Sequence, residues 1–202
     1  MNKSAIWLTI FLSVLLWSGY QPKDQFTWFL EVLPAIAALP LLFFTRKSFP
    51  LTSLAYGLIL VHAVILMVGG HYTYAEVPLF DDIAQWMGSD RNNYDKVGHL
   101  AQGFIPALLA REVLIRQAVL QPGAWCHFLV CCFALALSAF YELIEWWVAL
   151  ATGEDAEAFL GTQGYVWDTQ SDMMMALIGA ISCLVLLSRV HDRLISDINA
   201  VR

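Results

Sequence analysis

The chain has 202 residues, of which 59% are apolar and only 14% are charged. An ordinary soluble domain carries about 25% charged residues, so this composition excludes that class and favours a protein embedded in a lipid bilayer. The formal net charge of −6 does not exclude an anionic membrane surface, because the acidic residues gather in particular segments. We expect membrane lipid as the partner of this chain and no nucleic acid.

Six apolar runs are long enough to cross a bilayer. A transmembrane helix needs about 20 mostly apolar residues, within a range of about 17–25. In chain order the runs are 4–20, 26–44, 51–70, 97–120, 124–151 and 173–190. The second run contains Glu31, Pro34 and Pro40, so we expect a kinked helix whose freed backbone groups are satisfied by neighbouring helices. The sequence therefore predicts an all-α, polytopic membrane protein with a single transmembrane domain over residues 1–202.

Lysine and arginine residues predict the orientation of these helices, because cytoplasmic segments carry an excess of them. With the amino terminus in the cytoplasm, the outer segments hold only Lys23, Arg91 and Lys96. The cytoplasmic segments then hold Lys3, Arg46, Lys47, Arg111, Arg116, Arg189, Arg193 and Arg202. We therefore expect both the amino and the carboxyl terminus on the cytoplasmic side, and we interpret Arg111 and Arg116 as topology anchors.

The outer segment 71–94 is long for a connection between two membrane helices. It contains Pro78, two adjacent aspartates and Trp86. Two interpretations stay open, a short helix or lid along the membrane surface and a passive connector.

Polar side chains interrupt the last three predicted helices at their outer ends. Each set has a helical spacing that places its members on one face. The sets are Asp95, His99 and Gln102 in the fourth helix, Ser138, Glu142 and Glu145 in the fifth, and Asp168 and Asp172 at the start of the sixth. Because the fourth and sixth helices begin outside and the fifth ends there, we expect all three sets at one level of the membrane.

Five carboxylates meet in this arrangement, with only Lys96 as a nearby positive charge. They cannot all stay ionised and unpaired, so protonation, an organic cation or a bound metal must resolve the excess. Carboxylate oxygens with one imidazole suit a divalent metal such as Zn, Mn, Mg or Ca. The candidate metal ligands are Asp95, His99, Glu142, Glu145, Asp168 and Asp172.

A purely structural interpretation is that Asp95, Asp168 and Asp172 cap helices, since carboxylates satisfy the free amides of a helix amino terminus. Capping does not explain Glu142 and Glu145, because the carboxyl end of a helix disfavours negative charge. Ionisable side chains inside a membrane are costly and commonly functional. The glutamates therefore favour a functional site.

Three functions are compatible with these residues. The first is a metal-assisted hydrolase or binder of a lipid or lipid-linked head group, with Glu142, Glu145 and His99 as catalytic residues and one glutamate as general base. The second is a proton- or cation-coupled transporter, although polar residues continue only sparsely toward the cytoplasmic side. The third is a membrane scaffold that the polar network locks together. Glu31, His62 and His71 are second-tier site candidates.

Three motifs together carry a resemblance to a known family. They are NYDKVGHLAQGF at 93–104, YELIEW at 141–146 and GTQGYVWDTQSDM at 161–173. The chain resembles the YjdF family of uncharacterised bacterial inner-membrane proteins over nearly its full length. This resemblance implies a location in the bacterial inner membrane as a multi-pass protein, and it implies no activity.

A more distant similarity is to VanZ-like membrane proteins, which are associated with glycopeptide resistance. It is carried by Asp95, Lys96 and His99, by Glu142 or Glu145, and by Asp172 with Gly179. The chain departs from that pattern at Ala176, where those proteins usually have asparagine.

Overall fold

The computed structural model describes residues 2–152 and 162–200. All regular secondary structure in these ranges is helical, which confirms the predicted all-α class. The helices are α1 Lys3–Gly19, α2 Gln25–Thr45, α3 Ser53–Tyr72, α4 Pro78–Met87, α5 Tyr94–Arg116, α6 Ala124–Thr152 and α8 Asp168–Ala200. Gly161, the first residue of the third motif, lies outside the described residues.

Four of these helices are long and apolar enough to cross a membrane, namely α2, α3, α6 and α8. The other two predicted spans correspond to α1, which is apolar but only 17 residues long, and to α5, which is 23 residues long and carries charged side chains at both ends. Large apolar side chains such as Leu16, Phe44 and Val185 are exposed on the surface of the bundle. Such a surface is expected of a protein that faces lipid tails.

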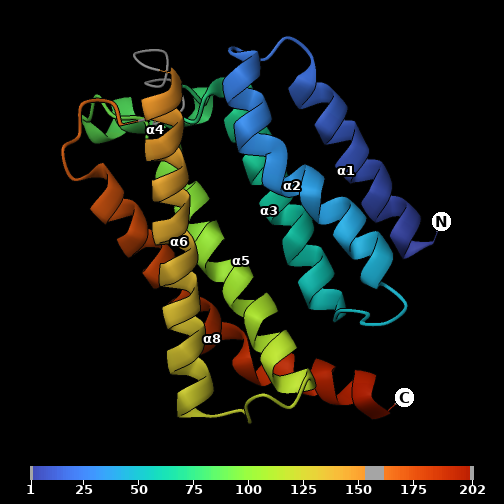
Figure 1. Ribbon diagram of the computed structural model, residues 1–202. Helices are drawn as coiled ribbons and strands as arrows, with labels where there is room; N and C mark the ends of the chain where they lie inside the picture. Colours follow the sequence, from blue (N-terminus) through green and yellow to red (C-terminus); the bar gives the residue numbers. More distant parts are fainter. Residues whose placement is uncertain (1, 153–161, 201–202) are drawn as a thin grey trace.

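The helices form two groups that meet at α3 and α5 (Figure 1). In the first group α3 packs against both α1 and α2, and in the second α5, α6 and α8 all pack against one another. The short α4 lies across the end of the bundle at which α5 and α8 begin and α6 ends (Figure 1). Segment 71–94 thus contains a short helix, one of the two structures predicted for it.

Side-chain caps fix the starts of two helices in the first group. Asp24 precedes α2 and accepts a hydrogen bond of 2.6 Å from the backbone amide of Thr27. Thr52 precedes α3 and accepts one of 3.2 Å from the amide of Ala55. Each cap satisfies an amide that has no partner inside its helix.

Glycines let α5 and α8 pack almost backbone to backbone. A Cβ on Gly103 would lie 1.8 Å from the carbonyl oxygen of Ala176, and a Cβ on Gly179 would lie 2.1 Å from that of Leu100. Real Cβ atoms do not approach so closely, so only glycine fits at these two crossings. Small residues at helix crossings are the usual basis of tight packing in membranes.

Two helices extend at least three residues beyond a predicted bound, and α5 also ends earlier than predicted, at Arg116 rather than at 120. α8 begins at Asp168 rather than at residue 173 and continues to Ala200 rather than 190, and α5 begins at Tyr94 rather than at 97. The added turns are polar, so an apolar run did not mark them. The earlier starts place Asp95 and Asp168 within helices.

A second buried polar cluster joins α3, α5 and α8 at the opposite end of the bundle. Glu112 is fully buried and accepts hydrogen bonds from Thr52 and Arg116, and it pairs with His191 at 3.0 Å. The buried Arg111 pairs with Asp192 at 2.6 Å. Both arginines interpreted as topology anchors therefore also form ion pairs, of which that of Arg111 joins α5 to α8 and that of Arg116 lies within α5.

Candidate functional site

The structure brings together the three polar sets that the sequence predicted to share one level. They lie at the end of the bundle where α5 and α8 begin and α6 ends. Asp95, His99 and Asp172 are buried, and so is Glu142. Glu145 follows Glu142 by one helical turn and faces the same site.

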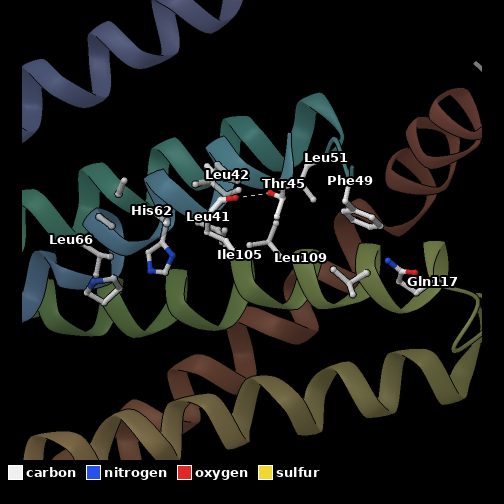
Figure 2. Close-up of a pocket in the computed structure, with 16 residues that line it drawn as sticks. Leu41, Leu42, Thr45, Phe49, Leu51, His62, Leu66, Ile105, Leu109 and Gln117 are labelled. Carbon is white, nitrogen blue, oxygen red and sulfur yellow. Dashed lines mark hydrogen bonds between the residues drawn. The ribbon is translucent and has the colours of Figure 1, made fainter. Parts of the chain in front are cut away.

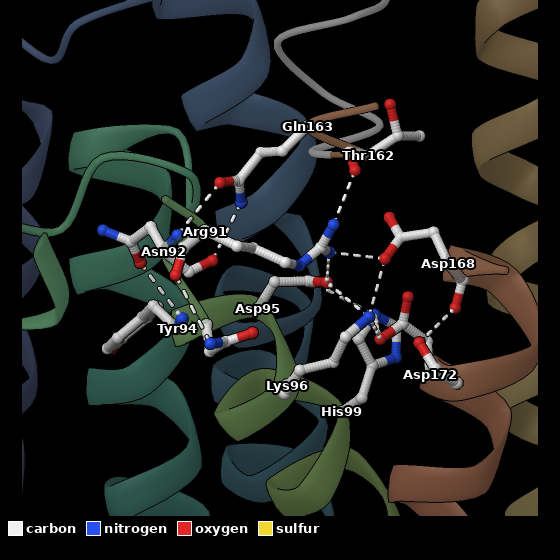
Figure 3. Close-up of polar contacts among 12 residues, drawn as sticks. Arg91, Asn92, Tyr94, Asp95, Lys96, His99, Thr162, Gln163, Asp168 and Asp172 are labelled. Carbon is white, nitrogen blue, oxygen red and sulfur yellow. Dashed lines mark hydrogen bonds and ion pairs between the residues drawn. The ribbon is translucent and has the colours of Figure 1, made fainter. Parts of the chain in front are cut away.

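Asp168 and Asp172 pair with positive charges in the first turns of α5 and α8 (Figure 3). Lys96 Nζ lies 2.7 Å from Asp168 Oδ1 and 2.6 Å from Asp172 Oδ1. Arg91 Nη2 lies 2.5 Å from the same oxygen of Asp168, and Arg91 Nη1 donates to the carbonyl of Thr162 at 2.6 Å. These pairs offset part of the negative charge and hold the two helix starts together.

A pair of amide hydrogen bonds fixes the segment before α5 against the segment before α8. The backbone amide of Asn92 donates to Gln163 Oε1 at 3.0 Å, and Gln163 Nε2 donates back to the carbonyl of Asn92 at 2.8 Å (Figure 3). This reciprocal pair sits beside Arg91. The loop that carries Thr162 and Gln163 is thereby held over the site.

His99 lies at the centre of the site. Its Nε2 is 3.3 Å from Asp95 Oδ1 and 3.9 Å from Asp172 Oδ1. Its Nδ1 lies 3.0 Å from Gln102 Oε1 and 3.9 Å from Glu142 Oε1. Both ring nitrogens therefore have polar neighbours, and the tautomer of His99 decides which nitrogen donates a hydrogen bond and which one can bind a metal.

Two groups of side chains have the geometry of a metal site, and His99 belongs to both. The first is Asp95, His99 and Asp172, and the second is His99, Glu142 and Glu145. Within each group the ligand atoms all lie within 4.8 Å of one another. Asp168 belongs to neither group, since its carboxylate is directed to Arg91 and Lys96.

Several buried polar atoms of the site have no hydrogen-bond partner within the described parts of the chain. They are Asp95 Oδ2, Glu142 Oε1 and Ser138 Oγ. An unsatisfied buried polar atom costs about 1–3 kcal/mol, and more when it is charged. Such atoms in a native site call for a ligand, a proton or water.

A cavity of about 230 Å³ opens beside His99, and we call it the acidic pocket. Its polar lining comes from four helices and the loop after α3. The polar residues are Glu31, His62, Tyr74, Asp95, His99, Gln102, Tyr141 and Glu145. Two of the three second-tier candidates, Glu31 and His62, therefore lie at the site. His71 does not line the pocket, and its Nδ1 lies 2.9 Å from the carbonyl oxygen of Ser18.

Tyr141 links the two groups of helices across this pocket. Its hydroxyl, on α6, donates a 3.2 Å hydrogen bond to Glu31 Oε2 on α2. Glu31 is buried. This contact adds a sixth carboxylate to the five that the sequence placed together.

Tyr74 closes the pocket between α3 and α5. Its backbone has a φ of 54°, in the left-handed region, and its amide donates to the carbonyl of Gly69 at 2.8 Å. The ring occupies the space that Cβ atoms on Gly69 and Gly98 would take. Burial raises the pKa of the Tyr74 phenol well above its usual value, so the hydroxyl remains a neutral donor.

Sequence reasoning missed the parts played by Arg91 and Tyr141. Arg91 precedes Asp95 by four residues, a spacing that brings side chains together on a helix, but it lies in a segment whose structure the sequence left open between a surface helix and a passive connector. The contact between Tyr141 and Glu31 joins residues 110 positions apart. No local pattern predicts a contact at that separation.

Known proteins resemble this chain over almost its whole length. The model of a family described as "Predicted membrane protein (DUF2238)" matches residues 3–193. A curated relative, "Inner membrane protein YjdF" of Escherichia coli (strain K12), is 52% identical over 193 residues, which cover 96% of this chain and 91% of the relative. No solved structure matches.

These matches confirm the resemblance to the YjdF family and the membrane location. The chain is a multi-pass protein of the inner membrane, as its apolar helices and this relative indicate. The similarity to VanZ-like proteins has no support in these matches, and we transfer nothing from it.

Proposed function

The chain belongs to the DUF2238 family of membrane proteins, and we propose that it binds a divalent metal ion at His99, Glu142 and Glu145 and uses it to bind and hydrolyse the head group of a lipid. The observation that carries this proposal is the meeting of two possible ligand groups at one histidine. The second group is the better one, because Asp172 of the first already pairs with Lys96.

The proposed topology has six membrane spans and both termini in the cytoplasm. α1 and α5 complete the count, since 17 and 23 residues of helix fall within the length that a span needs. The distribution of lysine and arginine supports this orientation. The site then opens toward the outer side of the membrane, where it meets head groups of the outer leaflet.

The charge of the site supports a cation. Six carboxylates lie at this end of the bundle, and the fixed positive charges beside them are those of Arg91 and Lys96 in the described ranges. Buried carboxylates that stay unpaired cost several kcal/mol each. Carboxylate oxygens with one imidazole nitrogen are ligands that suit Mn, Mg or Zn.

The same residues have the chemistry of ester hydrolysis. A divalent ion held by His99 and the two glutamates would supply Lewis-acid chemistry at a phosphoryl or carbonyl oxygen. Glu142 or Glu145 would take a proton from the attacking water through the carboxylate oxygen that does not hold the ion. Asp95 and Gln102 orient His99, and Asp168 has a structural role with Arg91 and Lys96.

The interior of the bundle supports a site that opens on one side of the membrane and does not support a polar transport path across it. Buried Ile105 and Leu108 lie on α5 between His99 and Arg111. Twelve residues of helix separate His99 from Arg111, or about 18 Å. The polar clusters at the two ends are thus separated by an apolar layer.

Metal analysis of the detergent-purified protein tests the proposal. We expect about one Mn, Mg or Zn per chain in the wild type and loss of it in a Glu142→Gln, Glu145→Gln double variant. Asp82→Asn, which changes an exposed acid of α4, serves as the control and retains the metal. Absence of metal from all three proteins, even after supplementation, would overturn the proposal.

A further inference from the structure

An apolar cavity of about 390 Å³ continues from the acidic pocket along α2, and we call it the apolar groove. The two cavities share Pro34, His62 and Leu66 as walls. Figure 2 shows the groove between α2, α3 and α5, with His62 and Leu66 toward one end and Phe49 and Gln117 toward the other. Its volume lies in the range of about 300–1,000 Å³ that small-molecule sites have.

The groove exists because α2 and α5 are held apart. α3 packs against both helices, whereas α2 and α5 have at most slight contact with each other. Small side chains, Ala35, Ala38 and Ala63, widen the gap on the α2 and α3 sides. Pro34 adds to this separation, because proline inside a helix removes a backbone hydrogen bond and bends the helix.

The groove is about as long as the hydrocarbon chain of one lipid, and in the proposed topology it extends from the acidic pocket toward the cytoplasmic half of the membrane. Pro34 and Thr45 both line it and are eleven residues apart on α2, which corresponds to about 16 Å of helix. Half of a hydrocarbon core of about 30 Å is about 15 Å. A lipid chain that starts at the acidic pocket can therefore lie along the groove.

A polar atom without a partner lies where the two cavities join. His62 Nε2 is buried and has no hydrogen-bond partner within the described parts of the chain. The imidazole extends from α3 into the groove (Figure 2). An oxygen that links a lipid head group to its hydrocarbon chain would satisfy this nitrogen, because such an oxygen would sit between the polar and apolar cavities.

We propose that the substrate is a long-chain lipid phosphate, whose hydrocarbon chain occupies the apolar groove, whose linking oxygen meets His62 and whose phosphate reaches the acidic pocket. The identification of the phosphate rests on the proposed function, since carboxylates alone repel an anion whereas a bound divalent ion attracts it. The occupancy of the groove by the hydrocarbon chain rests on the groove itself.

A photoreactive probe tests this proposal on the purified protein in detergent. The probe is a long-chain alkyl phosphate with a diazirine on the chain, and mass spectrometry locates the labelled residues. We expect saturable labelling of groove residues such as Leu41 and Leu109. Ala38→Phe fills part of the groove and should reduce this labelling roughly tenfold or more, because the loss of about 1.4 kcal/mol of binding free energy lowers the affinity tenfold. Ala37→Phe, whose site is exposed and outside the groove, keeps the labelling of the wild type.

Two controls separate this proposal from the metal site. Ala38→Phe retains the bound metal, because the substitution lies outside both ligand groups. If the purified protein contains no metal and its groove is still labelled, the proposed bound cation and the proposed recognition of a phosphate are wrong. The proposed position of the hydrocarbon chain in the groove is then supported. Labelling of the groove could instead fail to saturate, stay unchanged in Ala38→Phe and equal the labelling of the exposed Phe133 on α6. That result would overturn the binding of the hydrocarbon chain in the groove, whatever the metal content.

Competition identifies the source of the lipid phosphate. An unlabelled monoacylglycerol phosphate and an unlabelled polyprenyl phosphate both carry the proposed chemistry. Displacement by the first at lower concentration indicates a glycerolipid, and displacement by the second indicates an isoprenoid. Failure of both to displace the probe overturns the assignment of a lipid phosphate.

Discussion

His99 is held in one orientation by partners on both of its ring nitrogens. Gln102 Oε1 lies 3.0 Å from Nδ1, and Asp95 Oδ1 lies 3.3 Å from Nε2. Partners of this kind set the tautomer and the direction of a histidine that binds metal. Gln102 would therefore govern metal affinity without touching the metal.

We predict that Gln102→Leu lowers the affinity for the metal roughly 10–100-fold, the usual effect of removing such a partner. A metal titration followed by calorimetry measures the change. Gln85→Leu, on the exposed surface of α4, is the matched control and retains the affinity of the wild type. A folded Gln102→Leu protein with unchanged affinity would show that His99 does not bind the metal as proposed.

The sequence predicts many residues of the site but not their partners. Asp95, His99 and Glu142 could be found because helical spacing places them on faces that topology brings to one level. Arg91 and Tyr141 could not be assigned, because their contacts with Asp168 and Glu31 depend on packing between distant segments. Tertiary contacts of this kind leave no periodic signal in the chain.

The crossing of α5 and α8 positions the ligands of the site at the level of whole helices. Gly103 and Gly179 lie at that crossing, where an added Cβ would meet backbone atoms of the other helix. Backbone cannot yield as the end of a flexible side chain does. The distance between His99 on α5 and Asp172 on α8 therefore depends on these glycines.

We predict that Gly103→Ala destabilises the protein by about 1–3 kcal/mol or more, the cost of overpacking a close contact, because α8 has to move away from α5. Thermal unfolding in detergent measures this effect. Gly57→Ala on α3 is the matched control, because its Cβ would meet nothing within 4 Å. Equal stability of the two variants would contradict the tight crossing.

Apolar runs of sequence located the helices but not all of their ends. α8 gains a polar turn at its start and a polar extension at its end, beyond the predicted range 173–190. The hydrophobic pattern marks contact with lipid or core, whereas these turns are stabilised by ion pairs such as those of Asp168. The sequence also did not predict the cavities beside α2, because a gap between helices depends on how the helices pack.

At the scale of the whole molecule, a polar cavity and an apolar cavity lie next to each other. The acidic pocket lies at one end of the bundle, the apolar groove extends from it, and a second polar cluster around Glu112 ties three helices together at the other end. This arrangement gives an amphiphilic ligand a place for each of its parts. The bound cation is the claim on which the proposed chemistry depends.

Anomalous diffraction from crystals grown with manganese tests that claim most directly. We predict one strong anomalous peak per chain within coordination distance of His99, Glu142 and Glu145, and its loss in crystals of the Glu142→Gln, Glu145→Gln variant. A crystal of the wild type with no peak at these residues, or with peaks only at the protein surface, would contradict a metal site in this membrane protein.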